Sequence, residues 1–85
     1  MIFYHGTNSE NLKMLFKNTW ITSDVFRALD YAEHRDGEDL VYLIWCEEKE
    51  VEFTFSPYGI VADYRLKVDK NIIGMLRFQD GRIKE

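Results

Sequence analysis

The stretch Phe3-Tyr4-His5-Gly6-Thr7, near the start of this 85-residue chain, decides the fold that the sequence predicts. The apolar residues 2–4 indicate a short strand, which runs without a break into His5, Gly6 and Thr7. An imidazole, a bare glycine backbone and a hydroxyl then stand at the mouth of the strand, where a ligand can reach them. The same residues are equally consistent with a strand that ends in a turn glycine beside a histidine without a function.

The segment after this strand indicates two helices with a brief strand between them. Ser9 is a good N-cap for a helix over about residues 10–17, whose apolar side chains form one stripe: Leu12, Leu15 and Phe16. Residues 20–21 read as a brief strand. Ser23 or Asp24 then caps a second helix that runs to about Arg35.

Strand patterns dominate from Asp39 onward. Residues 40–46 are continuously apolar, as expected of a strand buried on both faces. Alternating residues predict strands near 51–55 and 60–68 with a turn between them, and Asp80-Gly81 indicates a terminal hairpin. We therefore predict a single α+β domain over residues 1–85, with two short N-terminal helices and a mostly antiparallel sheet.

The composition narrows the class of protein. With 46% hydrophobic residues the chain can build a core without a disulfide or metal, and its one cysteine, Cys46, has no partner for an intrachain disulfide. The chain has no apolar run long enough to span a membrane and no signal-peptide pattern, so we expect a cytoplasmic protein. The net charge of −4 argues against non-specific nucleic acid binding, but not against a defined nucleotide or a basic protein partner.

Three short motifs occur in an order that resembles a known family. They are Tyr-His-Gly-Thr at residues 4–7, Trp-Ile-Thr-Ser at 20–23 and Ala-Leu-Asp-Tyr-Ala at 28–32. Together they resemble the N-terminal half of the ADP-ribosyltransferases, in the His-Tyr-Glu branch that includes poly-ADP-ribose polymerases and diphtheria-type toxins. The resemblance covers about residues 2–32, and 85 residues is very short for a member of this family.

The resemblance implies a binding site for NAD, which is the substrate of these enzymes. His5 would bind the adenosine-side ribose, the Gly6 backbone would pair with the nicotinamide carboxamide, and Tyr31 would stack on the nicotinamide ring. The hydroxyls of the ribose pocket would come from three further residues, namely Thr7, Thr22 and Ser23.

The family's third motif residue, a Glu on a late strand, has no obvious counterpart in this chain. By order and pattern the candidate catalytic carboxylate is Asp63, which would stabilise the oxocarbenium-like centre that forms when nicotinamide leaves. Alternation also allows Asp63 to lie on a solvated strand face. A carboxylate from the acidic run remains an alternative: Glu47, Glu48, Glu50 or Glu52.

We thus expect a minimal NAD-dependent mono-ADP-ribosyltransferase that modifies a macromolecular target, with no bound metal. The alternatives are an inactive relative that sequesters NAD or ADP-ribose, and an inhibitor that binds a protein partner. A short acidic domain of this kind also suits a phage or mobile-element effector. Pairing of an exposed terminal hairpin would give a homodimer.

Overall fold

The computed structural model describes residues 1–32, 38–55, 62–80 and 82–84. Within these ranges the elements are β1 (Ile2–Thr7), β2 (Met14–Leu15), β3 (Trp20–Ile21), α1 (Val25–Tyr31), β4 (Asp39–Trp45), the 3-10 helix η1 (Glu48–Glu50), β5 (Val51–Phe55), β6 (Ala62–Leu66), β7 (Lys70–Asn71), β8 (Gly74–Gln79) and β9 (Arg82–Ile83). Every strand pair among them is antiparallel.

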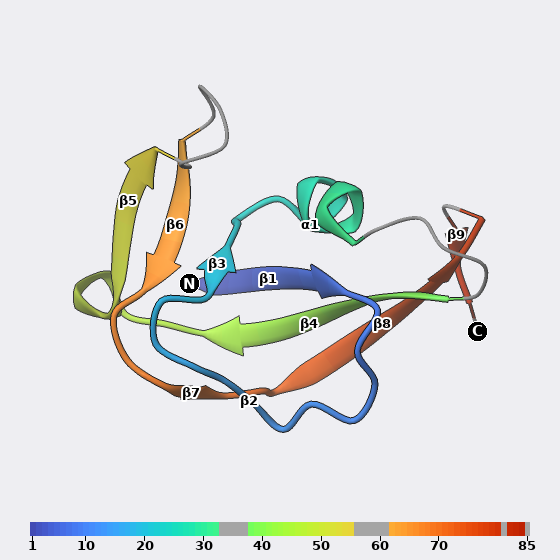
Figure 1. The fold of residues 1–85 in the computed structure, drawn as a ribbon, viewed down its shortest axis with the longest axis horizontal. Helices are drawn as coiled ribbons and strands as arrows, with labels where there is room; N and C mark the ends of the chain where they lie inside the picture. Colours follow the sequence, from blue (N-terminus) through green and yellow to red (C-terminus); the bar gives the residue numbers. More distant parts are fainter. Residues whose placement is uncertain (33–37, 56–61, 81, 85) are drawn as a thin grey trace.

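The strands form two main sheets that meet at β1 and β3. One sheet has the order β1-β4-β8-β9, the other has the order β3-β6-β5, and β2 pairs with β7. In Figure 1 the first sheet runs across the molecule, and β5 and β6 stand upright at one end of it. Among the described residues, one isolated backbone bridge, between Tyr4 and Thr22, joins the two sheets. The junction therefore leaves β1 and β3 free to diverge on either side of this bridge.

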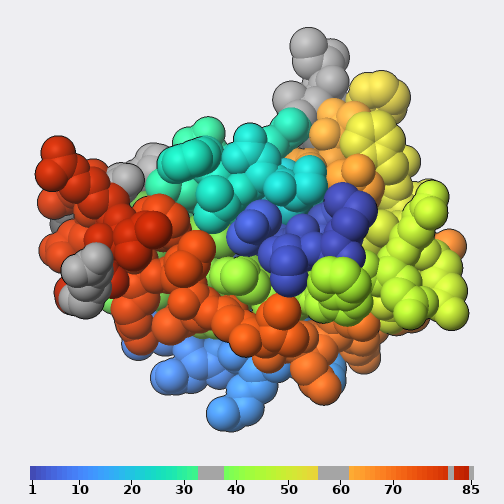
Figure 2. All heavy atoms as spheres, turned by 180° about the vertical axis from the view of Figure 1, so that it is seen from behind, coloured from blue at the N-terminus to red at the C-terminus, as the bar shows by residue number. Residues whose placement is uncertain are grey.

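The apolar side chains of β1 and β4 divide between two core clusters, one on each face of the sheet. The α1 side is filled by Ala28, Leu29, Val41 and Phe78. The other side is filled by Phe3, Leu15, Ile21, Ile44, Cys46 and Leu66. Figure 2 shows the molecule from behind, with α1 in teal above the dark blue of β1. The central strand β4 contributes to both clusters, which explains its continuous apolar sequence.

The prediction of two N-terminal helices is wrong. Residues 10–17 contain no helix, and their one regular element is the two-residue strand β2. Asn11 adopts a left-handed backbone with φ of 61°, which interrupts helical hydrogen bonding. The backbone groups of this segment bond to distant residues instead: Leu12 N–H to the Tyr42 hydroxyl, and Lys13 C=O to Ile72 N–H. An eight-residue helix is marginal by itself, so these tertiary contacts override the local pattern.

The second predicted helix exists but is shorter than expected. Of the two predicted N-caps, Asp24 fills the role, because its carboxylate accepts a hydrogen bond from Phe26 N–H at 2.9 Å. The helix ends at Tyr31 because Ala32 is extended, with ψ of 117°. The predicted turn at 56–59 and the hairpin residue Gly81 lie outside the described residues.

Candidate functional site

Strand β1 and the residue after β3 are joined by one antiparallel bridge, between Tyr4 and Thr22, and the two chains then separate at Gly6. Tyr4 N–H donates to the Thr22 carbonyl at 2.8 Å, and Thr22 N–H donates back to the Tyr4 carbonyl at 3.0 Å. In an antiparallel ladder the residue two positions further on points its own N–H and C=O at the same edge. The N–H and C=O groups of Gly6 thus point toward β3. If the pairing continued in register, their partner would be Trp20.

The Gly6–Trp20 pair does not form. The Trp20 carbonyl instead bonds to Nδ1 of His5 at 2.9 Å. On the β4 side Gly6 stands opposite Val41 in a non-hydrogen-bonded position, because Met1 and Cys46 form a hydrogen-bonded pair and such pairs alternate along the ladder. Within residues 1–32, 38–55, 62–80 and 82–84, the N–H and C=O of the buried Gly6 therefore have no backbone partner. Buried backbone groups are nearly always paired in proteins. The split between the strands therefore leaves the hydrogen-bond donor and the acceptor of one residue without a backbone partner.

The separation follows from competing strand partners. Trp20 and Ile21 pair with Arg65 and Tyr64 of β6, so β3 belongs to the second sheet while β1 belongs to the first. The imidazole of His5 occupies the position where a backbone hydrogen bond to the Trp20 carbonyl would form. The histidine at position 5 and the strand topology together keep Gly6 and Trp20 from pairing.

His5 is held as a neutral hydrogen-bond acceptor. A carbonyl oxygen can only accept, so Nδ1 carries the proton that bonds Trp20, and Nε2 keeps a free lone pair. Burial lowers the pKa of the His5 imidazole from 6.5, and the bond to the Trp20 carbonyl opposes this effect. The uncharged ring can accept a hydrogen bond from a ligand hydroxyl at neutral pH.

The lowered pKa of His5 predicts a loss of stability in mild acid. Unfolded chains bind the imidazole proton more readily, so this contribution is complete above pH 6.5 and is lost as the pH falls toward the lower folded pKa. We expect the free energy of unfolding in urea to fall between pH 7.5 and 5.5, and His5→Gln to reduce that fall. Both proteins should carry His34→Gln, which removes the other histidine. Equal pH dependence in the two proteins would contradict the assignment.

Gly6 is also the contact point of α1 on β1. A Cβ at this position would lie 1.6 Å from the Ala28 carbonyl oxygen and 3.1 Å from the Ala32 nitrogen. The last turn of α1, which carries Tyr31, therefore lies directly on the Gly6 backbone. The lack of a side chain permits this close approach of the helix, whereas the predicted pairing of the Gly6 backbone with a carboxamide stays a prediction.

Tyr31 forms a second cluster with Asp63 and Arg27. The Tyr31 hydroxyl donates to Asp63 Oδ2 at 2.7 Å, and Arg27 Nε lies 3.1 Å from both the Tyr31 hydroxyl and Asp63 Oδ2. Burial and the bond to Asp63 raise the pKa of Tyr31, whereas Arg27 opposes the rise. Asp63 is only 4% exposed, so of its two predicted environments the solvated strand face does not apply.

The cluster contains a buried donor that lacks a partner. Nη2 of Arg27 makes no hydrogen bond and is shielded from solvent, although the whole side chain is 33% exposed. Asp63 anchors the cluster from β6, and α1 supplies the other two members, which are four residues apart and share one helix face. Arg27 was missed in the sequence reasoning, although this spacing to Tyr31 was a usable signal.

The structure does not bring His5 and Tyr31 into contact. Alternate residues of a strand point to opposite faces, and Gly6 faces α1, so the His5 side chain lies on the other face. There its cross-strand neighbour Tyr42 bonds through its hydroxyl to Ser9. His5 and Tyr31 are both close to Gly6 in another sense. His5 precedes Gly6 in β1, and Tyr31 belongs to the helix turn that covers Gly6.

The three predicted hydroxyl residues have different surroundings. Thr7 accepts a hydrogen bond from Ser9 N–H at 3.2 Å, and the buried Thr22 accepts one from Asp24 N–H at 3.2 Å. Both hydroxyls thereby stabilise local turns. Ser23 is exposed beside them.

The acidic run that offered alternative carboxylates is engaged in structural contacts. Glu47 and Glu50 form a capping box around η1, and Glu50 also forms an ion pair with Lys70 at 3.0 Å. Glu52 forms an ion pair with Arg65 at 2.9 Å. Glu48 lines a groove on the opposite face of the second sheet from Asp63. These contacts account for Glu47, Glu50 and Glu52 without a catalytic role.

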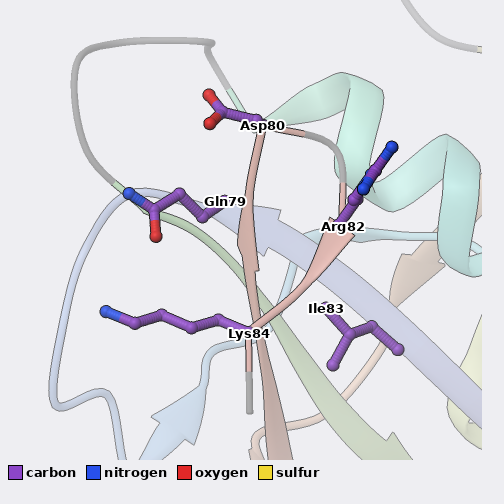
Figure 3. A pocket seen from close by; sticks show the side chains of 5 residues that line it. All are labelled: Gln79, Asp80, Arg82, Ile83 and Lys84. Atoms are coloured by element: carbon purple, nitrogen blue, oxygen red, sulfur yellow. The ribbon is translucent and has the colours of Figure 1, made fainter.

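The remaining surface features lack a converging set of polar side chains. Figure 3 shows a hollow whose lining residues all come from the β8–β9 hairpin: Gln79, Asp80, Arg82, Ile83 and Lys84. These residues are all exposed, and their side chains do not converge on one point. In the described part of the chain, no group of three or more His, Cys, Asp or Glu side chains is placed to hold a metal ion.

Comparison with known proteins adds no relative. No protein-family model, curated protein or solved structure matches this chain. In the ranges that the structure describes, no helix has the length and apolar character needed to cross a membrane.

Proposed function

We propose that the split between β1 and β3 binds NAD through the nicotinamide carboxamide. The observation that carries this proposal is the unpaired N–H and C=O of Gly6 at the sheet edge. A primary amide offers the complementary pair, because its oxygen accepts from N–H and its NH₂ group donates to C=O. Two such bonds in one plane select an amide over an acid or an ester.

Two neighbouring side chains, His5 and Tyr31, could contact other parts of the dinucleotide. His5 Nε2 is an acceptor for a ribose hydroxyl, because Nδ1 is committed to Trp20. Tyr31, which is 46% exposed, offers an aromatic surface on the turn that covers Gly6. The resemblance of residues 2–32 to ADP-ribosyltransferases supports the same ligand.

The reaction that fits this ligand is transfer of ADP-ribose to a macromolecule. The bond between nicotinamide and C1′ of the ribose breaks, and nicotinamide leaves with the bonding electrons. A nucleophile of the target then forms a bond to C1′ and releases its proton. Asp63 would stabilise the positive charge on the ribose during this exchange.

A second candidate is nucleotide binding without turnover. The Asp63 carboxylate already accepts a hydrogen bond from Tyr31 and forms an ion pair with Arg27. These contacts would have to rearrange before the carboxylate could face a ribose. This observation favours a domain that sequesters NAD or ADP-ribose.

The amide pairing predicts a sharp preference between two dinucleotides that differ at one group. We expect NAD to bind at least about tenfold more tightly than its nicotinic acid analogue, because a carboxylate would face the Gly6 carbonyl without a donor. Isothermal titration calorimetry of the full chain measures both affinities. His5→Ala should weaken the binding of both compounds, whereas Lys67→Ala, at an exposed site, serves as the control. Equal affinity for the two compounds would contradict the amide pairing.

Nicotinamide release distinguishes the two candidate functions. The full chain is incubated with NAD labelled in the adenosine part and with cell extracts that supply acceptors. Free nicotinamide together with label on a macromolecule supports the transferase. Binding of NAD without either product supports sequestration.

A further inference from the structure

A groove lies on the face of the second sheet that is opposite to Asp63. Its volume is about 540 Å³, which is within the range of small-ligand sites. The start of β1, the 3-10 helix η1 and the strands β5 and β6 supply the lining residues: Met1, Phe3, Glu48, Val51, Phe53 and Tyr64. None of these residues belongs to the proposed NAD site, so the groove is a separate place for a ligand.

Aromatic rings form one wall of this groove. The Tyr64 ring lies 5.0 Å from the Phe53 ring with an interplanar angle of 56°, and 4.9 Å from the Phe3 ring with an angle of 62°. Phe3 is 1% exposed and Phe53 is 65% exposed, so the wall runs from the core to the solvent. The faces of aromatic rings carry partial negative charge, which attracts cations.

The groove also contains a carboxylate without a partner. Within the described ranges the Glu48 carboxylate makes no hydrogen bond or ion pair, whereas those of Glu47 and Glu50 each pair with a lysine. No lysine or arginine is among the described residues that line the groove. The ammonium group of Met1, which also lines it, donates to the Cys46 carbonyl at 3.0 Å. The charge of Glu48 and the ring faces therefore both favour a positively charged ligand.

We propose that this groove binds an arginine side chain of a basic protein partner. The guanidinium group stacks on the faces of Phe53 and Tyr64, and its N–H groups donate to the Glu48 carboxylate. The chain has a net charge of −4, which attracts a basic partner at long range.

The lining favours arginine over other occupants. A guanidinium is planar and weakly hydrated, so it can stack on a ring and hydrogen-bond a carboxylate at the same time. The ammonium group of lysine is compact and strongly hydrated, and it loses more hydration when it enters an apolar groove. A quaternary ammonium has no N–H to donate to Glu48, and a neutral apolar side chain makes no use of the charge.

The test titrates the full chain with three small probes, followed by two-dimensional NMR of the backbone amides. The probes are N-acetyl-arginine methylamide and the matching citrulline and lysine compounds, of which citrulline has nearly the shape of arginine without its charge. The arginine probe should shift the amide signals of residues 48, 51, 53 and 64. We expect it to bind at least about fivefold more tightly than either of the other probes.

Two substitutions separate the contributions of charge and ring. Glu48→Gln keeps the shape of the side chain and removes its charge, and Phe53→Leu keeps an apolar side chain and removes the ring. Each should weaken binding of the arginine probe by about threefold. The matched controls lie on α1, where Asp30→Asn removes an exposed charge and Phe26→Leu replaces a phenylalanine that is 67% exposed. Both controls should leave the affinity unchanged.

Several outcomes would overturn the proposal. Equal affinity for the arginine and citrulline probes would mean that charge has no part in binding, and equal affinity for the lysine probe would exclude selection of a guanidinium. Absence of binding, or shifts confined to other residues, would exclude the groove. The comparison of probes on the wild-type chain needs no substitution, so it holds even if a variant fails to fold. It also needs no NAD, so its failure would leave the proposed function untouched.

Discussion

Gly6→Ala is expected to destabilise the domain by about 3 kcal/mol or more. The new methyl group would lie 1.6 Å from the Ala28 carbonyl oxygen, which is a backbone atom that cannot rotate away. The helix would have to lift from β1, exposing Ala28 and Leu29, which are buried against the sheet. A domain of this length has a total stability of roughly 4–13 kcal/mol, so the loss is a large share. Urea unfolding followed by circular dichroism measures it.

Gly74→Ala is the matched control for this prediction. Gly74 also lies in a strand of the first sheet, but a Cβ there would meet Leu43 Cβ at 3.9 Å, an ordinary contact. We expect a change below about 1 kcal/mol, in either direction. Equal losses for the two variants would show that the contact between α1 and Gly6 is not the cause.

The second large effect is expected from Asp63→Ala, with a loss of about 2–3 kcal/mol. The Asp63 side chain is 5% exposed and neutralises Arg27, whose Nη2 is already buried without a partner. Removing the carboxylate leaves the partly buried guanidinium without its counter-charge and removes the acceptor of the Tyr31 hydroxyl, which keeps only its bond from Arg27 Nε. Breaking a buried ion pair typically costs about 3–5 kcal/mol, and partial exposure of Arg27 reduces that figure. Thermal and urea unfolding measure the loss.

Glu52→Ala tests whether burial is the cause. The Glu52–Arg65 pair lies on neighbouring strands of the same sheet with a similar distance of 2.9 Å, but both side chains are well exposed. Exposed pairs contribute little, so we expect a loss of about 0.5 kcal/mol or less. A loss as large as that of Asp63→Ala would contradict the distinction. The measured stability of Asp63→Ala is also needed for the functional test. It shows whether a loss of turnover in this variant comes from unfolding.

Local pattern was sufficient for several elements. The apolar run at 40–46 predicted the central strand, because a strand buried on both faces needs apolar side chains at every position. The alternation at 51–55 predicted β5, and Asp24 was one of two predicted caps. In each case neighbouring residues supply the physical cause, so a short window of sequence contains the information.

The site was predictable only in its parts. The sequence singled out His5 and Gly6, but the unpaired donor and acceptor arise because β3 leaves β1 to pair with β6. The Trp20 carbonyl, which holds His5, carries no side-chain signal at all. Asp63 was chosen by strand order, whereas its burial against Tyr31 depends on contacts across 32 residues of chain.

The sequence by itself determined which residues prefer strands and where one helix begins. The tertiary structure decided that residues 10–17 form no helix, because their backbone groups bond to Tyr42 and Ile72 instead of to one another. It also decided that β1 and β3 separate at Gly6. Both outcomes depend on competition between distant partners for the same backbone hydrogen bonds, and local periodicity contains no record of that competition.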